Sequence, residues 1–149
     1  MKLIPKPQEG EYPPYTIEYI NWVPDDGEVL AYLETNFEVV RAYVMELPES
    51  RLDEPHAPGE WTIKDILLHI MDSERVFAYR TLRIARGDTT PLPGFEQDDY
   101  VPYANANARS LDDILAEYKA IRTATTTLLN SLDDDAISRT GTASGYPVS

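Results

Sequence analysis

Three long stretches of this chain place apolar side chains at alternating spacings of three and four residues. This pattern is typical of helices that bury one face, and its heptad form favours near-parallel packing in a bundle. We therefore expect an all-α fold with helices over residues 27–47, 63–86 and 111–132. The seam positions are Leu30, Leu33, Phe37, Val40, Val44 and Leu47 in the first helix, Ile63, Ile66, Ile70, Ser73, Phe77, Arg80 and Ile84 in the second, and Leu111, Ile114, Tyr118, Ile121, Thr125, Leu128 and Leu132 in the third.

Each predicted helix begins after a residue whose side-chain oxygen can accept a hydrogen bond from the first turn. The second helix has clear signals, with Thr62 and Asp65 as a capping pair and Gly87 at its end. Its seam is unusual, because Ser73 and Arg80 interrupt an otherwise apolar stripe. The remaining signals are Asp25 or Asp26 and Pro48 for the first helix, and Ser110 with Asp113 for the third.

Residues 1–24 are rich in proline, which forbids a continuous helix there. We expect an extended arm whose aromatic side chains pack onto the body of the protein. These aromatic residues are Tyr12, Tyr15, Tyr19 and Trp22. A chain of 149 residues suits one domain, so we assign residues 25–149 to a single helical domain.

Two further segments lie outside the predicted helices. Residues 87–109 form a connector with several prolines, and connectors of this length are often functional lids. Residues 133–149 are polar, and we expect a loop there. Three helices can close a bundle by themselves, but the connector and the final loop suggest a fourth helix that this chain does not contain. The domain at 25–149 is therefore expected to be incomplete at its C-terminal end.

The charge of the chain restricts its partners. A formal net charge of −13 would repel nucleic acid and anionic membranes. No apolar run reaches the roughly 18 residues that a membrane span requires, and the N-terminus lacks the apolar core of a secretory signal. The absence of cysteine excludes disulfides and thiolate metal sites. We therefore expect a cytoplasmic protein without nucleic-acid or membrane partners.

Of the two histidines, His69 is the stronger candidate for chemistry. His56 lies in a turn, where an exposed loop histidine is expected. His69 lies in the middle of a predicted helix, and Asp72, Arg80 and Arg83 continue along its face. Such an imidazole could be a metal ligand supported by a neighbouring carboxylate. The alternative is a partly buried histidine paired with Asp72, and spacing alone favours that alternative.

A complete metal site does not follow from the residues alone. A catalytic zinc ion takes three protein ligands and keeps one position open. The chain contains neither an H-x-x-x-H nor an H-E-x-x-H pair, and its many carboxylates show no pattern that places two of them beside His69. Phosphate-binding and serine-hydrolase motifs are also absent.

Residues 59–75, G-E-W-T-I-K-D-I-L-L-H-I-M-D-S-E-R, contain the pattern W-[ST]…H-x-x-D-x-E-R. Further blocks follow in order at residues 77–80, 83–88, 93–98, 107–111 and 141–145. By these blocks the chain resembles the DinB/YfiT-like superfamily over nearly all of its length after residue 24. This superfamily is unrelated to the DNA polymerase that shares part of its name.

The resemblance implies a DinB-like four-helix bundle of the up-down-down-up type, with three long helices present here and the fourth missing. It also implies a divalent metal of the zinc, nickel or manganese class, held by three histidines. One of these corresponds to His69. The other two form an H-x-x-x-H pair on the fourth helix and have no counterpart here, so the metal can be absent from this chain.

The resemblance further implies a function. Superfamily members are similar to thiol-dependent S-transferases that use bacillithiol, mycothiol or glutathione, and to metal-dependent hydrolases. The expected partner is therefore a small-molecule thiol or an electrophilic substrate. His69 would hold the ion, Asp72 would orient His69, and Arg80 would receive an anionic group, with Arg83 as a further candidate. The roles of the last three residues rest on helix spacing.

Two hypotheses remain at this point. The first is a metal-dependent enzyme domain that is inactive or incomplete as a 149-residue chain. The second is a non-catalytic helical module that works by binding or oligomerisation. A bundle without its fourth helix would expose apolar seams, and exposed seams of this kind invite association. We therefore expect a homodimer.

Overall fold

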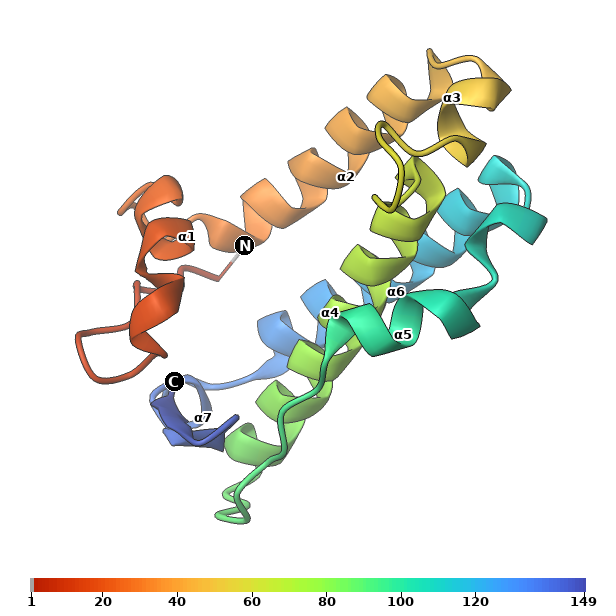
Figure 1. The fold of residues 1–149 in the computed structure, drawn as a ribbon. Coiled ribbons are helices and arrows are strands. Elements are labelled where there is room, and N and C mark those ends of the chain that lie inside the picture. The colour runs from red at the N-terminus through yellow and green to blue at the C-terminus, as the bar shows by residue number, and fades with distance from the viewer. Residues whose placement is uncertain (1) are drawn as a thin grey trace.

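The computed structural model describes residues 2–149 and confirms the three long helices (Figure 1). They are α2 (Val29–Met45), α4 (Ile63–Ala85) and α6 (Leu111–Ser131). The predicted all-α class is therefore confirmed, with a small two-stranded sheet as the exception. The remaining elements are η1 (Pro14–Thr16), α1 (Ile17–Trp22), α3 (Glu49–Asp53), α5 (Gln97–Ala104), η2 (Ala106–Ala108), α7 (Asp134–Ile137), β1 (Gly141–Ala143) and β2 (Tyr146–Val148).

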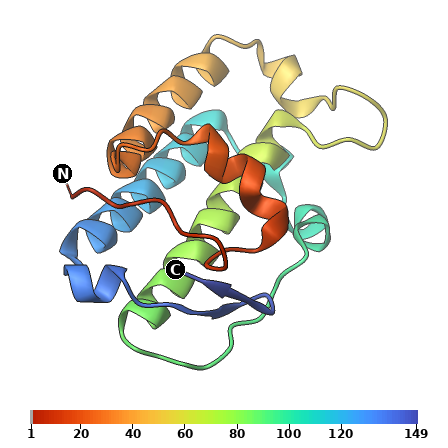
Figure 2. The ribbon, with the colours of Figure 1, turned by 90° about the vertical axis from the view of Figure 1, so that its left-hand side faces the viewer.

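The three long helices are not packed equally on one another. Helix α6 packs against both α4 and α2, whereas α2 and α4 contact each other little. Figures 1 and 2 show α2 and α4 as separate arms, both backed by α6. We call the side between α2 and α4 the open side, because no fourth long helix among residues 2–149 fills it; in Figure 2 the N-terminal arm and α1 cross in front of it.

The core lies where α2 and α4 meet α6. Tyr118 and Ile114 of α6 are almost completely buried, and the ring of Tyr118 meets that of Phe37 edge to face at 5.2 Å between centroids. Burying one large apolar side chain stabilises a fold by about 1.5–3 kcal/mol, so this cluster holds the three helices together. Its buried members are Phe37, Val44, Leu52, Leu67, Leu68, Met71, Ala106, Ile114, Leu115, Tyr118 and Ile121.

The core face of α4 differs from the predicted seam. The buried positions are Lys64, Leu67, Leu68, Met71, Ile84 and Ala85. Ile66 and Phe77, which the heptad pattern assigned to the core, are 43% and 55% exposed. The prediction was wrong there because α6 contacts an adjacent face of α4, so the exposed stripe borders the open side of the bundle.

The ends of the helices follow local chemistry. Thr62 and Asp65 form the predicted capping box of α4, and Ser110 caps α6 through the N–H of Asp113. Helix α2 begins later than predicted. Asp26 accepts a hydrogen bond from the N–H of Glu28 at 2.9 Å, but Gly27 adopts a positive φ of 76° and delays the first helical turn.

The N-terminal arm is tied to the body by backbone hydrogen bonds and by the side chain of Lys2, which pairs with Asp134. The N–H of Ile4 donates to the carbonyl of Gly27 at 2.9 Å, and the N–H of Ser149 donates to the carbonyl of Glu11 at 3.0 Å. The expectation that the arm's aromatic residues pack onto the body was wrong for Trp22, which is 74% exposed, and for Tyr19. A short helix, α1, forms between Pro14 and Pro24 and turns these rings outward.

The segments predicted as loops contain additional structure. Helix α5 forms within the connector and packs on α4. The last residues form a β-hairpin with Ser144 and Gly145 as its turn, at φ values of 53° and 82°. Leu92 of the connector pairs with Ala143 of this hairpin. No helix within residues 2–149 is long and apolar enough to cross a bilayer.

Candidate functional site

His69 lies on the side of α4 that α5 covers. Its side chain lines a small hollow with Asp65 and Asp72, which share its helix face at spacings of four and three residues. The opposite wall comes from the connector and α5, through Phe95, Gln97, Tyr100, Val101 and Ala104. The connector therefore covers the histidine, as a lid would.

The imidazole of His69 is partly buried. The Trp61 ring lies beside it, with 5.1 Å between the ring centroids and 55° between the planes. The hollow has room for about one water molecule. Only a ligand of about that size therefore fits beside the imidazole without movement of α5. His56, by contrast, is exposed in the loop between α3 and α4, as predicted.

Asp72 forms an ion pair with Arg75, which lies three residues further along α4. Its Oδ1 lies 3.6 Å from Nη1 of Arg75, and Arg75 also pairs with Glu117 of α6. Within residues 2–149, no hydrogen bond joins Asp72 to the His69 ring. The structure brings the two side chains to one hollow without joining them, so the orienting role of Asp72 stays a prediction.

Arg80 lies three turns along α4 from His69. Its Nη2 donates to the carbonyl of Pro93 at 2.7 Å and to Oγ of Ser144 at 3.0 Å. The guanidinium carbon lies 5.7 Å from the centroid of the Phe77 ring and 5.9 Å from that of Phe95. Arg80 therefore joins α4, the connector and the terminal hairpin, and a guanidinium held against two rings also gains from cation–π attraction.

Arg83 is engaged at the end of α4. Its Nε donates to Asp88 and its Nη1 to the hydroxyl of Tyr79. The hydrogen bond from Arg83, together with those from Thr90, holds the pKa of Asp88 well below its usual range. The guanidinium thus fastens the turn after the helix, and it lies apart from the hollow that contains His69.

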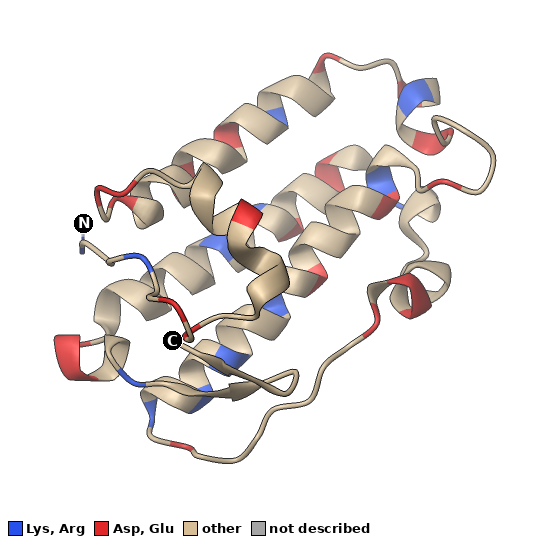
Figure 3. Cartoon of the chain, turned by 60° about the vertical axis from the view of Figure 1, so that its left-hand side comes forward, with Lys and Arg blue, Asp and Glu red and all other residues tan. Residues whose placement is uncertain are grey.

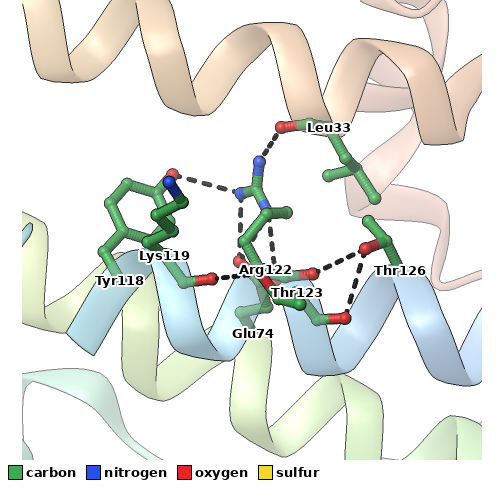
Figure 4. A network of polar contacts seen from close by, with 7 residues as sticks. All are labelled: Leu33, Glu74, Tyr118, Lys119, Arg122, Thr123 and Thr126. Atoms are coloured by element: carbon green, nitrogen blue, oxygen red, sulfur yellow. Dashed lines mark hydrogen bonds and ion pairs between the residues drawn. The ribbon is translucent and has the colours of Figure 1, made fainter. Parts of the chain in front are cut away.

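The sequence analysis missed a buried polar network between α4 and α6 (Figure 4). Nε of Arg122 lies 3.0 Å from Oε1 of Glu74, and its Nη2 donates to Oε2 of Glu74 and to the hydroxyl of Tyr118. Its Nη1 donates to the carbonyl of Leu33. Burial raises the pKa of Tyr118. Every nitrogen of the Arg122 fork is therefore satisfied, which points to a structural role.

A cavity of about 450 Å³ lies beside this network, between α2 and α6. Three of its polar side chains already serve the helix backbone. Thr123 donates to the carbonyl of Lys119 at 2.8 Å, Thr126 to that of Arg122 at 3.0 Å, and Asn130 to that of Thr126 at 2.9 Å. The cavity contains no histidine, and the side of α4 that carries His69 and Arg80 is the better candidate site.

The comparisons with known proteins agree with this fold. A profile of the DinB superfamily matches residues 32–149. The chain belongs to the DinB superfamily.

A solved structure of YfiT from Bacillus subtilis is similar to this DinB-superfamily chain. The TM-score is 0.72 and the identity 18%, over 98% of this chain and 79% of the YfiT chain. YfiT is described as a probable metal-dependent hydrolase with an unusual four-helix bundle topology. The likeness confirms the fold that the resemblance implied. No curated protein matches the chain significantly.

The described part of this DinB-superfamily chain does not complete a metal site. Among residues 2–149, no group of three or more histidine, cysteine or carboxylate side chains is placed to hold an ion. His69 is a suitable nitrogen ligand, and Asp65 and Asp72 line the same hollow, but a catalytic metal requires three well-placed ligands. The residues present therefore fit one ligand of such a site and not the whole.

Proposed function

We propose that the chain is a metal-dependent enzyme domain of the thiol S-transferase or hydrolase type, in which His69 is one metal ligand. The observation that carries the proposal is the placement of His69 in a small covered hollow beside two carboxylates, on a fold shared with YfiT. The 149-residue chain alone is expected to be inactive, because the side chains of residues 2–149 do not complete the ligand set. The reacting partner is a small-molecule thiol or an electrophile, and the setting is the cytoplasm.

The experiment compares two histidine variants. The chain, His69→Ala and His56→Ala are titrated with nickel, zinc and manganese while backbone amide signals are followed by NMR. We expect paramagnetic broadening by nickel to centre on the middle of α4, to disappear in His69→Ala and to persist in His56→Ala. Equal behaviour of the two variants, or no effect near His69, would contradict the metal-ligand role.

A second candidate function is association without catalysis. Exposed apolar side chains on two helices support it, among them Val39 and Tyr43 of α2 and Ile66 and Phe77 of α4. Between 43% and 64% of each of these side chains is exposed, so they are accessible to a second molecule. In this proposal the chain is a helical binding module that forms a homodimer.

A further inference from the structure

We propose that Arg80 and Ser144 form a binding site for a carboxylate group. The first support is the charge balance around Arg80. Among the described residues, four arginines are buried or partly buried: Arg80, Arg83, Arg109 and Arg122. The other three each pair with a carboxylate, whereas Arg80 pairs with none. Its neighbours are two aromatic rings, a carbonyl and a hydroxyl, so its positive charge is not compensated.

The missing partner is notable in a chain with 26 acidic and only 13 basic residues. Arginines gather along the C-terminal half of α4, where Arg80 lies (Figure 3). A partly desolvated guanidinium binds a carboxylate more strongly than an exposed one does, because less competing water surrounds it. A ligand carboxylate would supply the charge that the fold leaves out.

The donors that remain free belong to both residues. Nη2 of Arg80 is used by Pro93 and Ser144, whereas its Nε and Nη1 have no hydrogen-bond partner within residues 2–149. Oγ of Ser144 accepts from Arg80, so its own hydroxyl proton remains available to a ligand. Ser144 keeps a positive φ of 53°, which is uncommon outside glycine and sets its side chain at the tip of the hairpin.

The charge of the chain and the surroundings of Arg80 favour a carboxylate over a phosphate. The chain carries a net charge of −13, and this field repels a dianion more strongly than a monoanion. The rings of Phe77 and Phe95 border the guanidinium and suit an apolar group next to the carboxylate. Arg80 lies eleven residues beyond His69, which is about 16 Å along a helix axis.

The assignment of this carboxylate to a substrate rests on the proposed function, but carboxylate binding itself does not. An extended molecule with a carboxylate at Arg80 would reach along α4 toward His69. This substrate class is an elongated carboxylate-bearing thiol or electrophile. Binding is measured on the metal-free chain, so failure of carboxylate binding and failure of metal binding are separate results.

The test uses sodium acetate with the full chain in the presence of EDTA. The backbone amide signals of Ser144 and Gly145 are followed by NMR, with sodium chloride and sodium phosphate at equal ionic strength as comparisons. We expect a saturable shift with acetate, a weaker response to phosphate and none with chloride. A shift that does not saturate, or that chloride reproduces, overturns the site. Tighter binding of phosphate overturns the carboxylate assignment.

Variants separate binding from structural support. Arg80→Lys keeps the charge but loses the fork, and we expect acetate affinity to fall about tenfold. Ser144→Ala should also weaken it, and Arg86→Lys, an exposed arginine on the same helix end, should leave it unchanged. Circular dichroism confirms that each variant folds. If Arg80→Lys and Ser144→Ala are folded and bind acetate as well as the original chain, the proposal is wrong.

Discussion

At the scale of single residues, charged side chains within the helices have partners that no local pattern reveals. Glu74 lies on α4 and Arg122 on α6, and each occupies a place in the helix interface where an apolar residue is usual. Both side chains are nearly inaccessible to solvent. A buried pair of this kind is costly to break from one side, because the remaining charge has no partner.

Glu74→Ala should therefore destabilise the protein by about 3 kcal/mol, since it leaves Arg122 charged and buried. The double variant Glu74→Leu with Arg122→Met removes both charges and should recover most of that loss. Urea unfolding of the single and double variants measures the free energies. If the double variant is as unstable as Glu74→Ala, the loss does not come from the unpaired charge of Arg122, and the prediction is wrong.

Arg83 permits a prediction about pH. The hydrogen bond from Arg83 is the largest cause that lowers the pKa of Asp88. A lowered pKa stabilises the fold above the ordinary aspartate pKa of about 4, and this stabilisation is lost as pH falls below that value. Arg83→Gln should move the pKa of Asp88 back toward its usual range. Titration of the Asp88 carboxyl carbon by NMR measures the shift, and Arg86→Gln, which should have no effect, is the control.

At the scale of the elements, the local sequence determines where two long helices, α4 and α6, begin. The hydroxyl of Thr62 accepts from the N–H of Asp65 at 3.1 Å and lies 2.9 Å from Oδ1 of Asn107. Ser110 makes the corresponding cap on α6, at 3.2 Å from the N–H of Asp113. Thr62 is buried and Ser110 is exposed.

Thr62→Ala should therefore cost more stability than Ser110→Ala. Loss of a cap costs about 1 kcal/mol, and Thr62→Ala also leaves Asn107 without its hydroxyl partner. Thermal unfolding of the two variants compares them directly. Equal losses would show that the contact between Thr62 and Asn107 adds nothing to the cap.

The terminal hairpin offers a sharper steric test. A Cβ atom added at Gly141 would lie 2.6 Å from Cγ1 of Ile84, closer than real Cβ atoms approach. Gly141→Ala should therefore displace the hairpin from α4. The additional change Ile84→Ala removes the clashing atoms and should partly restore the packing of the hairpin on α4. Gly94→Ala is the mild control, because its nearest contact would be 3.4 Å. Hydrogen exchange of the Leu92 and Ser144 amides reports the outcome.

At the scale of the whole molecule, the main feature is the open side between α2 and α4. No fourth long helix among the described residues lies there, and Ile66 and Phe77 of α4 stay exposed; such apolar surfaces promote association. In the homodimer proposed above, this face lies against its copy.

Ile66→Glu should then weaken the homodimer by at least tenfold, because it places a charge in the apolar contact. Leu3→Glu introduces the same charge at an exposed apolar residue in the N-terminal arm and should leave the dimer unchanged. Sedimentation equilibrium over a range of concentrations measures the dissociation constants. A chain that stays monomeric at every concentration would contradict the homodimer.

The sequence by itself determined the three long helices, the caps at Thr62 and Ser110 and the place of His69 on its helix. These features depend on neighbours within a few positions, through spacing, capping and backbone preference. Resemblance to the DinB superfamily added the topology, which spacing alone could not supply.

Only the tertiary structure decided which face of α4 is buried, which charged side chains pair and whether the aromatic side chains of the N-terminal arm are buried or exposed. The heptad pattern placed Ile66 and Phe77 in the core, but α6 approaches an adjacent face and leaves them exposed. The pairing of Glu74 with Arg122 and the approach of Ser144 to Arg80 join residues far apart in the chain. Such contacts arise from packing between elements, and the sequence pattern within one helix does not determine which residues of another element will pack against it.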